Sequence, residues 1–163
     1  MTEQTEGKLS VFVASLEETE RLATQLALLL RSGDVLCLRG GLGAGKTTFT
    51  RALVAALGSP APVSSPTFTL VHEYPGGPFP IWHADAYRLS GPEDAPDTGL
   101  EEIFRSGRGV VILEWPEQIE AALPPDYLEI RIEDTSGDDT RAFTLTPRGP
   151  RWANLAQDWP RTC

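Results

Sequence analysis

A run of small residues that ends in a lysine and a threonine is the segment best suited to chemistry. Residues 40–47 have glycine at the first and sixth positions, followed by Lys46 and Thr47, which fits the phosphate-loop pattern G-x-x-x-x-G-K-[ST]. Glycines let the backbone curl so that successive N–H groups point at phosphate oxygens. A lysine there reaches the outer phosphates, and a threonine hydroxyl can ligate Mg²⁺. We therefore expect a nucleotide to be bound by Gly41, Leu42, Gly43, Ala44, Gly45, Lys46, Thr47 and Thr48.

A carboxylate at the end of a second apolar run completes the expected metal site. Residues 110–113 are all apolar and are followed by Glu114, a Walker B pattern with Glu in place of the usual Asp. Strands of this kind also end on solvated acids without a role. Because a phosphate loop is present, we interpret Thr47 and Glu114 as the metal ligands.

Two further groups could reach the nucleotide. His83 and Asp85 are two residues apart at the end of an apolar run, so in a strand both side chains face one side. For His83, a structural hydrogen bond and a catalytic role stay open. Asp85 is expected to orient the attacking water or metal-bound water. Thr67 lies in a proline-containing segment that either contacts the γ-phosphate or its magnesium, or simply leads into a strand.

Two side chains keep open interpretations. Trp115, directly after Glu114, either packs over the site or fills the core. Arg88 could serve a phosphate, a partner or a nearby acid.

The surrounding elements must position these groups. The apolar pattern predicts an edge strand over residues 9–13 and a helix from Leu16 to Leu30, capped by Ser15 and Glu18 and stopped by Gly33. The remaining elements follow in chain order: a buried parallel strand over 34–39, a helix over 46–57, a hairpin of 67–74 with 79–83, a short helix over 100–105, a buried strand over 109–114, and a closing hairpin of 127–133 with 141–146. We expect an α/β fold: one P-loop NTPase-like domain over residues 1–163, with a mixed central β-sheet flanked by helices, a core of about 9–146 and a C-terminal tail of 147–163.

Composition limits the partners and the compartment. The 163 residues carry 23 acids against 14 bases, a net charge of −9, which is the wrong sign for a protein that holds nucleic acid mainly by neutralising phosphates. We expect no direct DNA binding. Two cysteines suggest reduced thiols rather than a disulfide framework. The first residues resemble no signal peptide and no apolar run approaches the ~20 residues that span a bilayer, so we expect a cytoplasmic protein without membrane contact.

Four motifs occur together and in order: residues 41–48, 65–71, 83–89 and 114–117. In this combination the chain resembles the bacterial TsaE (YjeE) family over about residues 15–146. The phosphate loop alone is generic, whereas the other three motifs together are specific to the family.

The resemblance implies a fold, an activity and partners. Such proteins bind ATP and Mg²⁺ and slowly hydrolyse ATP to ADP and phosphate. They act with an assembly of TsaD and TsaB that transfers threonylcarbamoyl to adenosine 37 of tRNAs reading codons that begin with A. Hydrolysis is thought to reset that assembly, so tRNA would be met only indirectly.

The family's roles carry over by position. Lys46 and Thr47 would serve phosphate and metal, Glu114 the metal, and Asp85 would lie near the γ-phosphate, so that Lys46, Asp85 and Glu114 form the expected catalytic group. One departure is Gly41, where the family usually has Asp.

Two other functions stay open from the sequence. A small-molecule P-loop kinase of this length needs a lid bearing arginines, for which Arg105 and Arg108 are candidates, but the segment after Asp85 is acidic and proline-rich. A nucleotide-gated binding module with incidental hydrolysis is the third possibility. The chain has no N-K-x-D motif for guanine, which favours ATP, and the start of the first helix, Ser15 to Thr19, is expected to cover the base.

Overall fold

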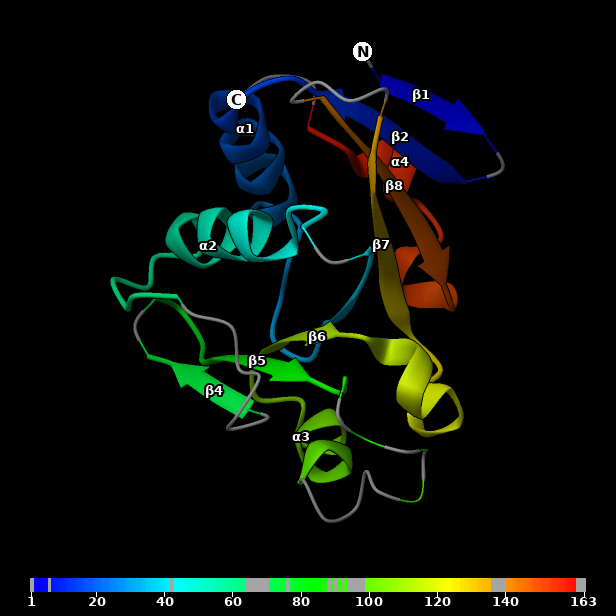
Figure 1. Cartoon of the computed structure of the whole chain (residues 1–163). Coiled ribbons are helices and arrows are strands. Elements are labelled where there is room, and N and C mark those ends of the chain that lie inside the picture. The colour runs from blue at the N-terminus through cyan, green and yellow to red at the C-terminus, as the bar shows by residue number, and fades with distance from the viewer. Residues whose placement is uncertain are drawn as a thin grey trace.

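A mixed sheet forms the centre of the fold in a computed structural model. The structure describes residues 2–5, 7–41, 43–63, 71–75, 77–87, 89, 91, 93, 99–135 and 140–160. Within this part, eight strands pair in the order β1-β2-β8-β7-β3-β6-β5-β4 (Figure 1). Their bounds are β1 (Thr2–Thr5), β2 (Lys8–Val13), β3 (Val35–Arg39), β4 (Val71–Tyr74), β5 (Ile81–Asp85), β6 (Val110–Glu114), β7 (Tyr127–Asp134) and β8 (Arg141–Arg148).

Parallel pairing brings the ends of the central strands to one edge. β3 pairs in parallel with β6 and β7, and β5 pairs in parallel with β6. Every residue of β3, β5 and β6 is buried, as the continuous apolar runs predict for parallel strands covered on both faces. The register sets Glu114 opposite Leu38 on one side and Asp85 on the other. The carboxyl ends of these strands therefore form one edge, where α/β folds collect their ligands.

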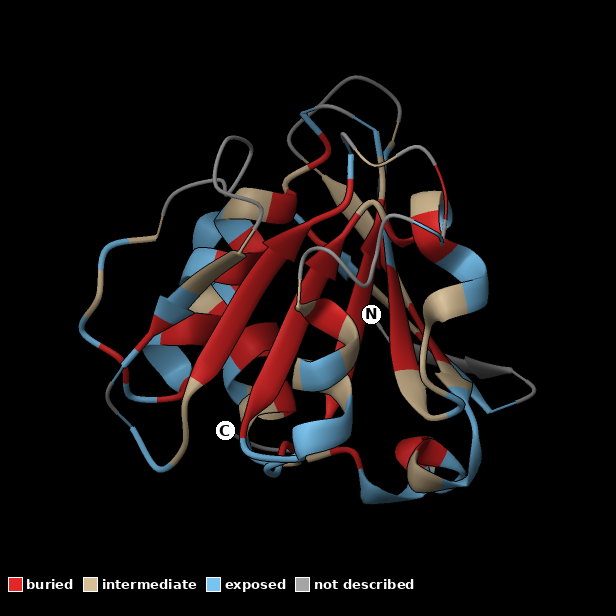
Figure 2. Cartoon of the chain, turned by 90° about the horizontal axis from the view of Figure 1, so that it is seen from below, coloured by how far each residue is buried: buried red, intermediate tan, exposed pale blue. Residues whose placement is uncertain are grey.

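Helices cover both faces of this sheet (Figure 2). α1 (Leu16–Ala27) and α2 (Lys46–Ala56) pack together on one face, over the larger apolar cluster. α3 (Leu100–Ser106) and the 3₁₀ segment η2 (Pro116–Ala122) contribute to the smaller cluster on the other face. The expected α/β class with a mixed sheet flanked by helices is confirmed. Two short segments, η3 (Pro150–Trp152) and α4 (Leu155–Asp158), follow β8.

Several boundaries differ from the sequence prediction. The strand at residues 8–13 is not an edge strand, because β1 pairs along its outer side. α1 ends at Ala27, before the expected Leu30, and residues 28–29 form a turn. β8 continues to Arg148, so the tail begins as part of the sheet. No described helix has the length and apolar character that crossing a membrane requires.

The tail is packed into the molecule as far as the structure describes it. Trp152, Leu155 and Trp159 are buried in the larger apolar cluster. Arg151 forms two 2.8 Å hydrogen bonds to the buried carboxylate of Asp34. The tail therefore completes the core beside α1.

A buried arginine ties the phosphate loop's strand to η2. Arg39, the last residue of β3, is 8% exposed. Its guanidinium donates to Glu129 on β7 at 2.9 Å and to Glu120 on η2 at 2.9 and 3.0 Å. Burial lowers the pKa of Arg39, but these hydrogen bonds raise it overall, so the guanidinium stays charged. This network fixes η2 against the edge at which the loop begins.

Arg39→Met should therefore destabilise the fold, because it leaves Glu129 buried without its main partner. We expect a loss of roughly 3 kcal/mol in the free energy of unfolding, measured by urea denaturation. Arg105→Gln is the control, since Arg105 pairs with Glu101 in the solvent at 3.5 Å and should cost below about 0.5 kcal/mol. Equal stability losses in the two variants would contradict the structural role of the Arg39 network.

Candidate nucleotide site

The loop between β3 and α2 has a backbone that only glycine fits at several positions. A Cβ on Gly40 would lie 2.7 Å from the carbonyl oxygen of Ile132, so the loop passes too close to β7 for a side chain. Gly43 and Gly45 have φ of 79° and 107°, in the left-handed region. At Gly41, a Cβ would meet nothing within 4 Å. The loop therefore has room for the Asp that the resembling family usually carries at this position.

The helix that follows the loop starts without a cap. Gly45 is the N-cap of α2 and offers no side chain to the free backbone N–H groups, and the first turn has no acidic residue. The first N–H groups of a helix have no partner within it and carry the positive end of its dipole. Thr47 is half-buried and Thr48 is exposed in this first turn. Together these features make the start of α2 a site for an anion.

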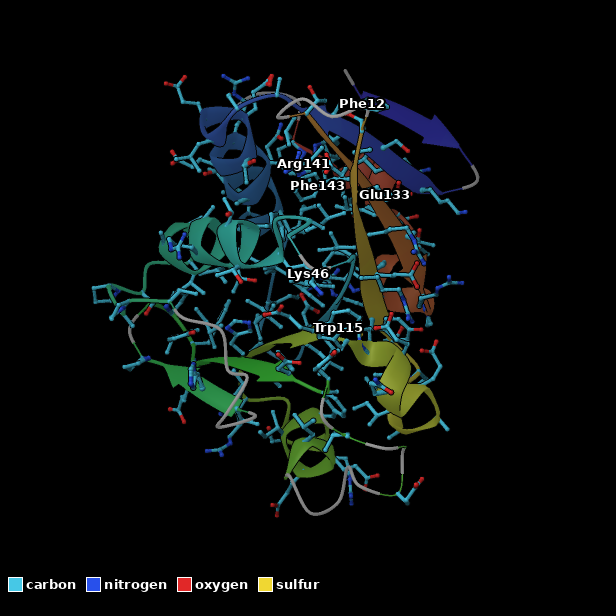
Figure 3. The ribbon with its side chains drawn as sticks, viewed as in Figure 1. Phe12, Lys46, Trp115, Glu133, Arg141 and Phe143 are labelled. Carbon is cyan, nitrogen blue, oxygen red and sulfur yellow. The ribbon has the colours of Figure 1, made fainter. Side chains whose placement is uncertain are left out.

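Lys46 points away from solvent and toward the sheet edge. Its ammonium donates to the carbonyl oxygen of Gly40 at 2.8 Å and lies 3.8 Å from the ring centroid of Trp115. Lys46 and Trp115 are labelled in Figure 3. Among the described residues, Lys46 forms no ion pair, although it is only 6% exposed. Burial lowers the pKa of Lys46, and nearby Glu114 and Asp85 act against this. A carbonyl dipole and an aromatic ring are weaker partners than a phosphate, so an anion in the loop would attract this cation strongly.

Trp115 is held over the site by an uncommon backbone conformation. It is the one non-glycine residue with positive φ in the described chain, at φ 58° and ψ 48°, a conformation that costs about 1–3 kcal/mol. Its ring packs against Tyr87 with centroids 4.9 Å apart. The half-buried indole thus covers Lys46 rather than filling the core.

Two buried carboxylates lie side by side at the ends of β5 and β6. Asp85 and Glu114 are register partners and are 6% and 4% exposed. Asp85 accepts a 2.8 Å hydrogen bond from the backbone N–H of Tyr87. Burial raises the pKa of Asp85 and Glu114 adds to this rise, whereas Tyr87, Lys46 and His83 lower the pKa. Both acids thus lie at the edge where Lys46 points.

His83 contacts Glu114 directly. Its Nε2 lies 2.5 Å from Glu114 Oε2, and its Nδ1 lies 3.2 Å from the hydroxyl of Tyr74. Of the two interpretations left open for His83, the structure shows the hydrogen bond, and its partner is a proposed metal ligand. Sequence reasoning missed Tyr74, since nothing in the alternation of β4 singles out this aromatic residue from its neighbours.

A pocket of about 370 Å³ lies beside the loop, large enough for a nucleoside. It is lined by the start of α1, the loop and the start of β8, with Val13, Ala14, Ser15, Leu16, Thr19, Ala44, Gly45, Thr48, Arg141 and Phe143. Arg141 Nε also donates to the carbonyl oxygen of Ala44 at 3.2 Å. Arg141 and Phe143 are labelled in Figure 3. Sequence reasoning missed both, because only the pairing of β8 with β2 brings them to the loop.

Some predicted groups cannot be placed. Leu42, Thr67 and Arg88 lie outside the described residues. Lys46, Asp85 and Glu114 are described and gather at one edge of the sheet, and Thr47 follows Lys46 in the first turn of α2.

A divalent metal would need ligands beyond the protein. Within the described residues, no three His, Cys, Asp or Glu side chains are grouped to hold a metal ion. Mg²⁺ in nucleotide sites takes one or two protein oxygens and completes its shell with phosphates and water. Thr47 at the start of α2 and Glu114 at the end of β6 fit that donor set.

Comparisons with known proteins agree with this arrangement. The model of the family described as Threonylcarbamoyl adenosine biosynthesis protein TsaE matches residues 13–143. A Bacillus subtilis (strain 168) protein named tRNA threonylcarbamoyladenosine biosynthesis protein TsaE is 43% identical over 145 residues, 89% of this chain and 89% of that protein. Proteins of the same name from Streptomyces coelicolor and Aquifex aeolicus are 43% and 42% identical, over 81% and 82% of this chain and 92% and 94% of theirs.

A solved structure extends the similarity to three dimensions. The structure titled "Crystal structure of Bacillus subtilus YdiB" superposes with a TM-score of 0.79 at 38% identity, covering 97% of this chain and 95% of that one. With its family model matching most of the sequence and relatives above 40% identity, the chain belongs to the TsaE family of tRNA threonylcarbamoyladenosine biosynthesis proteins.

Proposed function

We propose that this protein is the Mg²⁺-dependent, ATP-binding and ATP-hydrolysing subunit of a tRNA-modifying assembly. The reaction it supports is threonylcarbamoylation of adenosine 37 in tRNAs that read codons beginning with A. The observation that carries the proposal is Lys46, buried under Trp115 beside an uncapped helix start. A cation in that place gains a full electrostatic partner when a triphosphate enters the loop.

Each part of the site has a separate task in binding. The N–H groups at the start of α2 would hold the phosphates, and Lys46 would neutralise the outer ones. The pocket between the start of α1 and Phe143 would take the nucleoside, in line with the expectation for Ser15 to Thr19. A bound Mg²⁺ would draw charge from the phosphate oxygens and lower the barrier to attack by water.

Hydrolysis would divide between the two buried acids. Glu114, with Thr47, would hold the metal or its water, since the start of α2 and the end of β6 meet at the same edge. Asp85 would orient the attacking water, because it lies next to Glu114. One of its oxygens accepts the N–H of Tyr87, which leaves the other oxygen for a water molecule. Turnover by the chain alone would be slow and would depend on partner proteins, as the family resemblance implies.

The partners follow from family membership and charge. With a net charge of −9, the chain is poorly suited to bind tRNA by itself and well suited to basic protein surfaces. TsaD and TsaB would be those proteins, and hydrolysis would reset their assembly between rounds. The cytoplasm would be the site of action.

The kinase alternative loses its two candidate arginines. Arg108 lies just before the first residue of β6, whereas Glu114 is the last residue of that strand. Arg105 is on α3, where it pairs with Glu101 and is 79% exposed. Neither is at the edge where Lys46 lies, so a lid built from them would not reach the loop.

Lys46→Ala should weaken ATP binding by about 10- to 100-fold, because the phosphates lose a charge-assisted hydrogen bond. Titration calorimetry measures this directly. Lys8→Ala is the matched control, since Lys8 is the only other lysine and is exposed on β2. Equal ATP affinity of the two variants would disprove the loop assignment.

Asp85→Asn should keep ATP affinity within about threefold while lowering turnover about 100-fold or more, as expected for loss of a group that orients water. With TsaD and TsaB, the variant should join the assembly but stall there without hydrolysing ATP.

In cells lacking the gene, Asp85→Asn should then fail to restore threonylcarbamoyladenosine, measured by tRNA nucleoside analysis. Asp158→Asn on α4 is the control and should restore it. Full restoration by Asp85→Asn would remove Asp85 from the reaction.

A further inference from the structure

A line of hydrogen bonds crosses three strands behind the site. The hydroxyl of Tyr74 on β4 lies 3.2 Å from His83 Nδ1 on β5, and His83 Nε2 lies 2.5 Å from Glu114 Oε2 on β6. His72, two residues before Tyr74 on β4, lies 3.4 Å from the same hydroxyl through its Nδ1. His83 is fully buried and Tyr74 is 4% exposed. From Tyr74 to Glu114 the line is therefore buried, whereas His72 is half-buried.

The chemistry of these groups fixes the direction at Glu114. A carboxylate that binds a metal is ionised and only accepts hydrogen bonds, so in the proposed role of Glu114 the hydrogen would lie on His83 Nε2. The other ring nitrogen is satisfied by a hydroxyl, which can donate or accept. Tyr74 therefore holds the imidazole plane, and the imidazole holds one oxygen of Glu114.

We propose that His83 is a positioning residue that aims the free oxygen of Glu114 at the metal, with Tyr74 fixing the ring of His83. This inference rests on the metal role of Glu114 in the proposed function. The side chain of Glu114 can rotate about three bonds. When His83 holds Oε2 in place, these rotations are restricted, and Oε1 remains in one orientation as the metal ligand. When a group that orients a metal ligand is removed, the protein typically loses 10- to 100-fold in metal affinity or activity.

The surroundings argue against a purely packing role. In register, His83 lies beside Ile112 on β6, and its neighbours on the same face of β5 are Ile81 and Asp85. An aliphatic residue would fill this place without the cost of burying an imidazole and a carboxylate together. The polar pair is therefore explained by what it does for Glu114.

The test measures metal binding rather than turnover. Mn²⁺ binding to the protein saturated with ADP is followed by electron paramagnetic resonance, in the wild type and in His83→Leu, His83→Gln and Tyr74→Phe. His83→Leu removes the donor at similar volume, whereas His83→Gln keeps an N–H that can reach Glu114. The matched control is His72→Leu, because His72 is the only other histidine and touches Tyr74 but not Glu114.

We expect His83→Leu to weaken Mn²⁺ binding at least tenfold while the affinity for metal-free ADP changes less than threefold. His83→Gln should recover most of the loss, Tyr74→Phe should show a smaller loss of the same kind, and His72→Leu should match the wild type. A folded His83→Leu protein with wild-type Mn²⁺ affinity would overturn the inference. A wild type that binds ADP but no Mn²⁺ would instead overturn the proposed metal function.

A second measurement needs no folded variant at position 83. In wild-type protein with ¹⁵N-labelled histidine, only two imidazole rings give signals. The inference predicts a hydrogen on His83 Nε2 with a strongly downfield proton resonance, which moves upfield in Glu114→Gln. A His83 Nε2 without a hydrogen would contradict it.

Discussion

The site depends on a lysine that is buried without an acid in contact among the described residues. Lys46 is held by the carbonyl oxygen of Gly40 and the ring of Trp115, two partners that stabilise a cation less than an anion does. The fold maintains this arrangement from both sides. β3 ends where the loop begins, at the edge of the sheet. The left-handed backbone at Trp115 places its indole against Lys46. The ion pairs of Arg39 then hold η2, the segment that follows Trp115, against β3.

The parallel register of β5 and β6 places the two acids to which we assign separate roles next to each other. Asp85 and Glu114 are opposite each other at the strand ends, but each has a different hydrogen-bond donor. Asp85 accepts from the backbone N–H of Tyr87, whereas Glu114 contacts the imidazole of His83, and both acids are buried. Different hydrogen-bond partners hold the two acids differently, which supports the proposal that Asp85 orients water and Glu114 holds the metal.

Local signals in the sequence were sufficient to predict the buried strands, the glycine-rich turn between a strand and a helix, and the position of the two acids at strand ends. The buried run before Gly40 and the helix after Lys46 follow from apolar periodicity and glycine spacing. Contacts made across the sheet left no such signal. The bond from His83 to Glu114 joins residues 31 apart, and it exists only because of the β5–β6 register. The positive φ of Trp115 is equally invisible, because left-handed backbone is expected of glycine rather than tryptophan.

The resonances of the two lysines test the central claim most directly. Lys46 is buried over an indole and Lys8 is exposed, so protein labelled with ¹³C at lysine Cε gives one ring-shifted and one ordinary signal. If triphosphate draws the ammonium from the ring and the Gly40 carbonyl, ATP with Mg²⁺ should move the Lys46 signal and leave Lys8 unchanged. A Lys46 signal that stays in place at saturating ATP would contradict the account.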